Sequence, residues 1–197
     1  MTARTSRGRR PGAPDTRAEV LAAARTSFAE KGFRGTTIRA VAASAGVDPA
    51  LVHHYFGTKD DLFVAALQIP VDPRAVLAPV VAAGPDGAGE RLLRTLLSVW
   101  DDPELRPGLV ALVRSLMSDD GAGLVRDGFI PVVVGPVLAG LVPDRPEVRI
   151  PLVASQVIGI ILGRYVVALP PLAQMPAEDL VARVGPTLQR YLTGDLP

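Results

Sequence analysis

Apolar residues recur at helical spacing through most of this chain, and a compact example lies at residues 38–45. One apolar helical face there consists of Ile38, Val41, Ala42 and Ala45. Gly46 favours a helix end directly after it, because glycine readily adopts the left-handed conformation found there. Asp48 and Pro49 favour a new helix, since Asp caps free N–H groups and Pro suits the first helical position. The pattern predicts two short helices joined by a tight turn.

The second of these helices has apolar residues that can pack it against the first. They are Val47, Leu51, Val52 and Phe56. Two helices joined by a short turn that contains glycine form the helix-turn-helix pattern, whose second helix enters the major groove of DNA. Residues 36–56 are therefore expected to read DNA.

The motifs around this pair make the pattern specific. The preceding helix ends in FAEKGFRGTT, the pair reads IRAVAASAGVDPALVHHYF, and GTKDDLF follows. In this order, residues 17–67 resemble the DNA-binding domain of the TetR family of bacterial transcriptional regulators. The resemblance implies an all-α protein of about 9–10 helices, with an N-terminal three-helix helix-turn-helix domain before a larger helical ligand-binding and dimerisation domain.

The remaining pattern predicts helices and no long strand. Flanking helices are expected at residues 16–31, ended by Gly32, and at residues 59–67, capped by Thr58. Later helices are expected at 73–83, 88–100, 103–118, 123–141, 147–169 and 177–192. We divide the chain into a basic arm (1–14) that is disordered when free, a helix-turn-helix domain (15–69) and a helical ligand-binding and dimerisation domain (70–197). The arginines of the arm are candidates for minor-groove contacts.

Charge separates the two parts of the chain. Residues 1–59 contain 10 Lys+Arg and 4 Asp+Glu, a net charge of +6, whereas residues 60–197 contain 11 and 16, a net charge of −5. A basic first third suits phosphate binding. The chain has no cysteine, which excludes disulfides and fits a cytoplasmic location. No metal or cofactor is expected, because His53 and His54 are adjacent and would point about 100° apart on a helix.

The two most apolar runs, residues 128–142 and 150–163, do not predict a membrane span. Prolines interrupt the first, and the second is about 14 residues long, short of the ~20 that a span needs. Both are expected to be buried helices of a soluble protein without a membrane partner.

Nine residues are candidates for DNA contact: Thr37, Arg39, Asp48, Pro49, Ala50, His53, His54, Tyr55 and Lys59. Pro49 and Ala50 can contact a thymine methyl group, and Asp48 can accept from cytosine, although its role as helix cap is the better supported one. The resemblance implies a guanine or phosphate contact for Arg39 and phosphate contacts for Tyr55 and Lys59. His53 stands where the family usually has tyrosine, and its imidazole can also donate to phosphate.

Small residues recur every four positions in the predicted helix 147–169, at Ser155, Gly159 and Gly163. Such a face allows close helix approach, either inside one subunit or between two. The resemblance favours a homodimer. It also implies a small-molecule effector, with pocket candidates at Trp100, Arg114, Met117, Phe129, Gln156 and Tyr165, each of which can equally be ordinary core packing. The aliphatic interior favours an apolar or amphipathic effector.

The sequence favours one of three classes of function. A ligand-responsive, dimeric repressor of a palindromic operator fits the motifs and the charge. An enzyme is disfavoured, because the chain lacks GxSxG, Walker and HExxH motifs. A helical protein–protein adaptor stays open, because the predicted reading face around His53 has neither Arg nor Lys.

Overall fold

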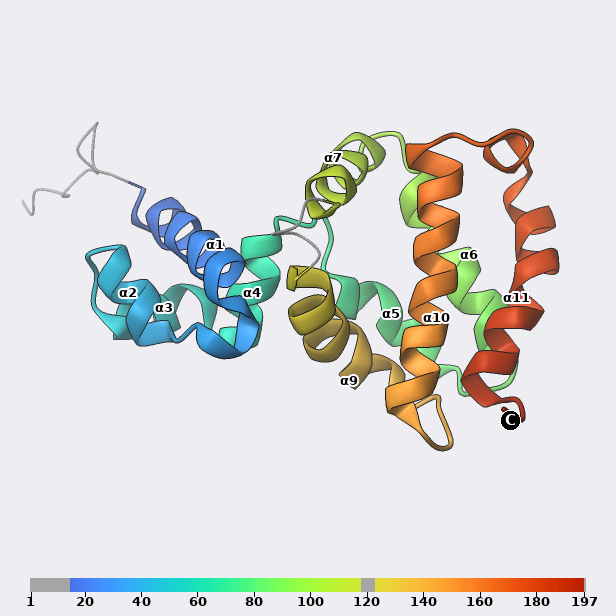
Figure 1. The fold of residues 1–197 in the computed structure, drawn as a ribbon, viewed down its shortest axis with the longest axis horizontal. Helices are drawn as coiled ribbons and strands as arrows, with labels where there is room; N and C mark the ends of the chain where they lie inside the picture. The colour runs from blue at the N-terminus through green and yellow to red at the C-terminus, as the bar shows by residue number, and fades with distance from the viewer. Residues whose placement is uncertain (1–14, 118–122, 197) are drawn as a thin grey trace, which may run out of the picture.

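The computed structural model describes residues 15–117 and 123–196, which form a small helical head joined to a larger helical body (Figure 1). The head consists of α1 (Thr16–Gly35), α2 (Ile38–Ser44), α3 (Pro49–Phe56) and α4 (Lys59–Leu67). The body consists of α5 (Pro73–Ala82), α6 (Ala88–Asp101), α7 (Arg106–Leu116), η1 (Val125–Val134), α9 (Gly135–Leu138), α10 (Pro146–Ile161), η2 (Leu162–Val166), η3 (Leu172–Gln174) and α11 (Ala177–Thr193). The all-α fold is confirmed. The division at residue 69 stays a prediction, and the basic arm lies outside the described residues.

The head follows its sequence pattern closely, with one difference in α1. Gly32 has a positive φ of 67°, as expected of a helix end, but a further helical turn continues to Gly35. The expected apolar stripe is buried along α1 at Val20, Leu21, Ala24 and Phe28. The predicted end at Gly32 is therefore a break in helical backbone, and the part that sequence did not predict is the additional helical turn that follows it to Gly35.

The predicted helix at residues 103–118 starts later than expected. The Asp102 carboxylate accepts hydrogen bonds from the backbone N–H groups of Glu104 (2.8 Å) and Leu105 (3.2 Å), and α7 begins only at Arg106. Pro107 then falls in the first turn, where its missing N–H costs nothing. The first-turn preference of proline explains the shift.

The predicted helix at residues 123–141 is divided into a π-helical segment, η1, and the short α9. Pro131 lies inside η1, where a proline in an α-helix would lose a hydrogen bond and clash with a carbonyl one turn back. The wider π turn accommodates it, and the N–H of Gly135 reaches back five residues to the carbonyl of Ile130. A second π turn, η2, ends the long helix at Val166, three residues before the predicted Leu169.

An aromatic cluster forms the centre of the head and extends to its contact with the body. The Phe63 ring of α4 meets Phe28 and Phe33 edge to face, with centroids 5.0 and 5.2 Å apart. From the body, Gly128 of η1 lies so close that a Cβ there would stand 2.4 Å from the Phe63 ring. Val133 of η1 is also buried in this cluster. The head is thus docked on the body through η1.

The body is built around the crossing of α6 and α11, and α10 packs against α11 (Figure 1). Backbones touch at this crossing, because a Cβ on Gly89 would lie 2.4 Å from the carbonyl oxygen of Gly185. The Gln189 side chain accepts a 2.9 Å hydrogen bond from the N–H of Gly89. Two glycines therefore set the spacing of the central helices.

One charged side chain is buried at the end of the body. Arg149 is 3% exposed, and its guanidinium pairs with Asp144 at 2.6 Å. It also donates to the carbonyls of Tyr191 (3.0 Å) and Gly194 (2.9 Å) at the end of α11. The buried charge is therefore satisfied, and it joins the start of α10 to the end of α11.

Replacing Gly89 with Ala should destabilise the body. The added methyl group meets backbone atoms at 2.4 Å, which cannot move as a side-chain tip could, so we expect a loss of about 3 kcal/mol in the free energy of unfolding. Urea unfolding would measure it. Gly123→Ala is the matched control, because a Cβ there meets nothing within 4 Å. Equal stabilities for the two variants would contradict the tight crossing.

Candidate DNA-binding surface

The helix-turn-helix unit is closed by local caps. Thr37 accepts a 3.1 Å hydrogen bond from the N–H of Ala40 and starts α2, while Gly46 turns the chain with φ of 67°. Asp48 accepts from the N–H of Ala50 at 2.7 Å and starts α3. The cap role expected for Asp48 is confirmed, Thr37 caps α2 in the same way, and the two caps fix where each short helix begins.

The outer face of α3 is open to solvent. Val52 and Phe56 are buried against the head, and Pro49 is half-buried. The exposed residues are Asp48, Ala50, His53, His54 and Tyr55. The packing thus presents the predicted reading residues on one side of the head, and their contacts with DNA stay a prediction.

His53 is held by the end of its own helix. Its Nδ1 lies 2.8 Å from the carbonyl oxygen of Gly57. Because a carbonyl only accepts, Nδ1 carries the hydrogen, and Nε2 is the ring nitrogen left for another partner. The neutral ring therefore offers an acceptor at Nε2, and only the imidazolium form would donate to a phosphate there.

The basic candidates lie around this face. Arg39 is exposed on the first turn of α2. Lys59 starts α4, and its ammonium lies over the Phe33 ring, 4.3 Å from the centroid. Burial lowers the pKa of Lys59, and Asp60 opposes this effect. The contact places the ammonium at the edge of the head, beside the start of α4.

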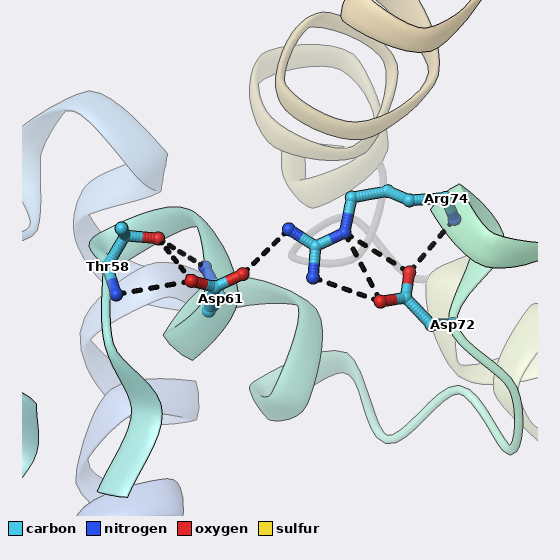
Figure 2. A network of polar contacts seen from close by, with 4 residues as sticks. All are labelled: Thr58, Asp61, Asp72 and Arg74. Atoms are coloured by element: carbon cyan, nitrogen blue, oxygen red, sulfur yellow. Dashed lines mark hydrogen bonds and ion pairs between the residues drawn. The ribbon is translucent and has the colours of Figure 1, made fainter. Parts of the chain in front are cut away.

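A polar network joins the start of α4 to the start of α5, and Figure 2 shows it. Asp61 accepts from the hydroxyl of Thr58 at 2.6 Å and from the guanidinium of Arg74 at 2.7 Å. Arg74 also pairs with Asp72 at 3.0 Å, so that its guanidinium lies between two carboxylates. These bonds lower the pKa of Asp61, chiefly through Thr58, and Arg74 lowers the pKa of Asp72.

Of this network, only the Thr58 cap is predicted by the sequence. The spacing of Thr58 and Asp61 is that of a capping box, and Asp72 before Pro73 is a helix-start signal. Both of these signals can be recognised in the sequence. The bond from Arg74 to Asp61 cannot be predicted in this way, because it depends on the fold of residues 68–72.

The six predicted effector residues do not gather in one place. Trp100 and Tyr165 stack, with centroids 5.2 Å apart, and the Tyr165 hydroxyl donates to Asp101 at 3.0 Å. Burial raises the pKa of Tyr165 to about 12. The other four are dispersed: Arg114 and Met117 are exposed, Phe129 packs on the head core, and Gln156 is half-buried in α10.

A cavity of about 390 Å³ lies elsewhere, between the head and α7. Its wall comes from α1, α4, α7 and the start of the η1 region, and none of the six predicted residues belongs to it. Sequence reasoning missed it because no local pattern reveals a gap between two packed parts of a chain.

The three predicted dimer residues differ in their exposure to solvent. Ser155 and Gly159 are exposed on α10, and a Cβ on Gly159 would meet nothing within 4 Å. Gly163, in contrast, is buried, and a Cβ there would lie 2.8 Å from the Leu172 side chain. Placing Gly163 on a dimer face was therefore wrong, because it serves close packing inside the chain.

The outer side of α10 is apolar as well as exposed. Val148 is 42% exposed and Ile158 is 40% exposed. Among the described residues, Pro146–Val166 is long and apolar enough to cross a membrane by length and composition, and 28% of the 18-residue apolar stretch within it is buried. The expectation that residues 150–163 form a buried helix was thus only partly correct, since one side of the helix faces outward.

The fold and this surface define a helix-turn-helix head on a helical body. Residues 20–66 match the family model described as bacterial regulatory proteins, tetR family. Residues 86–192 match the tetracyclin repressor-like C-terminal domain. The chain therefore belongs to the TetR family, whose members are transcription regulators and not enzymes.

Individual relatives agree. A crystal structure of a TetR-family regulator from Streptomyces coelicolor A3 is 38% identical, with 94% of this chain and 98% of that chain covered and a TM-score of 0.54. The HTH-type transcriptional regulator BetI of Paraburkholderia xenovorans is 30% identical over 111 residues, 47% of this chain and 57% of BetI. The HTH-type transcriptional repressor AcnR of Corynebacterium glutamicum is 31% identical over 90 residues, 46% of this chain and 43% of AcnR. The chain thus spans about half the length of these curated relatives.

Asp61→Asn should weaken the head. One carboxylate oxygen binds Thr58 and the other binds Arg74, so an amide must turn its NH₂ group toward one of them, at a cost of about 1 kcal/mol at pH 7. Because the pKa of Asp61 is lowered, its contribution is complete above the ordinary value of about 3.9 and is lost as the pH falls below it.

Urea unfolding of wild type and variant between pH 7 and 3 would test this, with the neighbouring Asp60→Asn as control. We expect the difference in unfolding free energy between wild type and Asp61→Asn to shrink as the pH falls. No such change is expected for the difference between wild type and Asp60→Asn. A gap that persists at pH 3 would show that the carboxylate charge is not what stabilises the head.

Proposed function

We propose that this protein is a ligand-responsive transcriptional repressor that acts in the cytoplasm. It binds a palindromic DNA operator as a homodimer and leaves it when a small-molecule effector binds. The observation that carries the proposal is the solvent-exposed outer face of α3, on a capped helix-turn-helix unit in the basic third of the chain. The name of AcnR describes a repressor and supports this direction of control.

Base contacts and phosphate contacts are expected from different residues of the head, because of the composition of α3. This helix has no Arg or Lys, so Pro49 and Ala50 are left to contact thymine methyl groups and His54 to approach a base edge. Arg39 from α2 is the candidate for a bidentate guanine contact. The N-terminus of α2 at Thr37 and the side chains of Tyr55 and Lys59 position the head on phosphates, and His53 joins them when its ring is in the imidazolium form.

One head reads too few base pairs to be specific, so a second copy is required. Two-fold symmetric helix-turn-helix proteins read half-sites about 34–36 Å apart. The exposed apolar side of α10, with Val148, Ser155, Ile158 and Gly159, is the candidate dimer face. An exposed apolar patch of this kind is typical of an interaction surface.

The effector is expected to be apolar or amphipathic, as the aliphatic interior indicates. It can release DNA only if it binds the DNA-free arrangement more tightly than the DNA-bound one, with a typical coupling of about 1–3 kcal/mol. The aromatic contact of Phe63 with Gly128 and the ion pair of Asp61 with Arg74 are the links by which the body can hold the head.

Selection of bound sequences from random duplex DNA, at two salt concentrations, tests the proposal. An enriched palindrome bound less tightly at high salt is expected. Lys59→Ala should weaken binding to all sequences equally and reduce the slope of log affinity against log salt concentration by about one. Arg39→Ala should instead relax the preference at one base pair of each half-site. Lys31→Ala, at an exposed position of α1, is the control for Lys59. A failure to enrich any palindrome would instead favour the protein–protein adaptor.

Gly159→Leu should weaken the dimer without harming the subunit. The glycine has open space in the single chain, so a leucine finds no clash there and obstructs only a partner helix. Sedimentation velocity should show a shift toward monomer, and Ser98→Leu, on the exposed side of α6, should leave the dimer intact. An unchanged sedimentation profile for Gly159→Leu would move the dimer face away from this part of α10.

A further inference from the structure

The head–body cavity has the composition of a ligand site. Its volume of about 390 Å³ falls within the range of about 300–1,000 Å³ typical of small-molecule sites. The wall is mainly apolar. Leu112, Leu116 and Leu124 line it from the body, and behind it on the head side lie Phe28 and Phe63, which are themselves fully buried. Such a wall suits an aliphatic chain, because burying it removes apolar surface from water.

The cavity exists because α7 packs loosely. Along the described length of this helix, only Leu109 is buried. Ala111 and Leu112 face the cavity instead of filling a core, and Gly108 supplies no side chain to close it. An occupant would therefore complete the packing between α7 and the head.

Arg25 of α1 is the one charged residue among the described residues that line the cavity. It is half-buried, and its Nε donates to the carbonyl of Ala66 at 3.1 Å. That bond fixes the guanidinium at the end of α4. No carboxylate among the described residues pairs with Arg25. Its two terminal nitrogens match a carboxylate, which guanidinium binds bidentately.

Gln68 supplies a second polar group at the same end of α4. It is the C-cap residue of this helix, with a left-handed φ of 53°. Glycine takes this conformation without strain, whereas glutamine does so at a cost. The side chain retained there lines the cavity, and its amide can donate to an anion.

We propose that the cavity binds an amphipathic carboxylate, with the charged end on Arg25 and Gln68 and an aliphatic tail along Leu112, Leu116 and Leu124. The inference deepens the proposed function, because it rests on the repressor reading for its effect on DNA. The binding itself does not require DNA. Since the occupant contacts α1 and α4 of the head together with α7 of the body, it favours one orientation of the head over others.

Calorimetric titration of the DNA-free, full-length protein with decanoate and 1-decanol tests the site. Wild type should bind decanoate at least about tenfold more tightly than the alcohol, because only the carboxylate pairs with Arg25. Arg25→Gln should remove that advantage and keep alcohol binding within about twofold. Lys31→Gln removes a charge from an exposed position of the same helix and should change neither affinity.

A second variant tests where the aliphatic tail of the ligand binds. Ala111→Trp, at a solvent-accessible position of α7, should fill the cavity and abolish binding of both compounds. Decanoate binding that survives Ala111→Trp, or that is equal in wild type and Arg25→Gln, would overturn the proposal. So would the absence of decanoate binding to wild type.

The effect on DNA is measured separately, with an operator obtained by the selection. Decanoate should release the operator from wild type and not from Arg25→Gln. If decanoate binds and the operator affinity stays unchanged, the cavity is not the effector site. If the ligand-free protein selects no operator, the repressor proposal fails, while the calorimetric result for the cavity still stands.

Discussion

The contact between Phe63 and Gly128 is the constraint on which the arrangement of this protein depends. Phe63 is a central residue of the head, since it meets two further phenylalanine rings, and it is also the surface on which η1 of the body rests. The close approach needs a residue without a side chain at position 128. The same ring that holds α4 against α1 therefore holds the head against the body, so a change in either packing is felt by the other.

The side of the head that we propose to face DNA is assembled from short helices that would not be stable alone. Helices α2 and α3 have seven and eight residues, fewer than the ~12–15 that an isolated helix needs. Caps from Thr37 and Asp48 fix their starts, and the buried core fixes their separation. In the proposed complex with DNA, backbone geometry sets the position of the head, and the few side chains on the outer face are the ones that contact bases.

Local rules predicted much of this molecule from sequence. The limits of α2, α3 and α4 followed from caps and apolar periodicity, because both act within a few residues. The reach of Arg74 to Asp61 and the burial of Gly163 did not, since each depends on how the residues between the two partners fold. The π turn at Pro131 was missed because a proline in a helical pattern more often indicates a break or a kink. The DNA-contact candidates around α3 lay together for the same local reason, whereas the effector candidates, chosen as polar or aromatic residues in apolar helices, were dispersed. The cavity beside Arg25 belongs to no single element and had no sequence signal.

The π-helical segment η1 has one further consequence, for the evolution of the chain. Phe129 and Val133 of this segment pack on the head core, while Ile130 and Val134 pack on the body core. Losing or gaining one residue inside a helix turns all later residues by about 100°. Such a length change in η1 would exchange residues between the two cores at once. We therefore expect relatives to conserve the number of residues within η1.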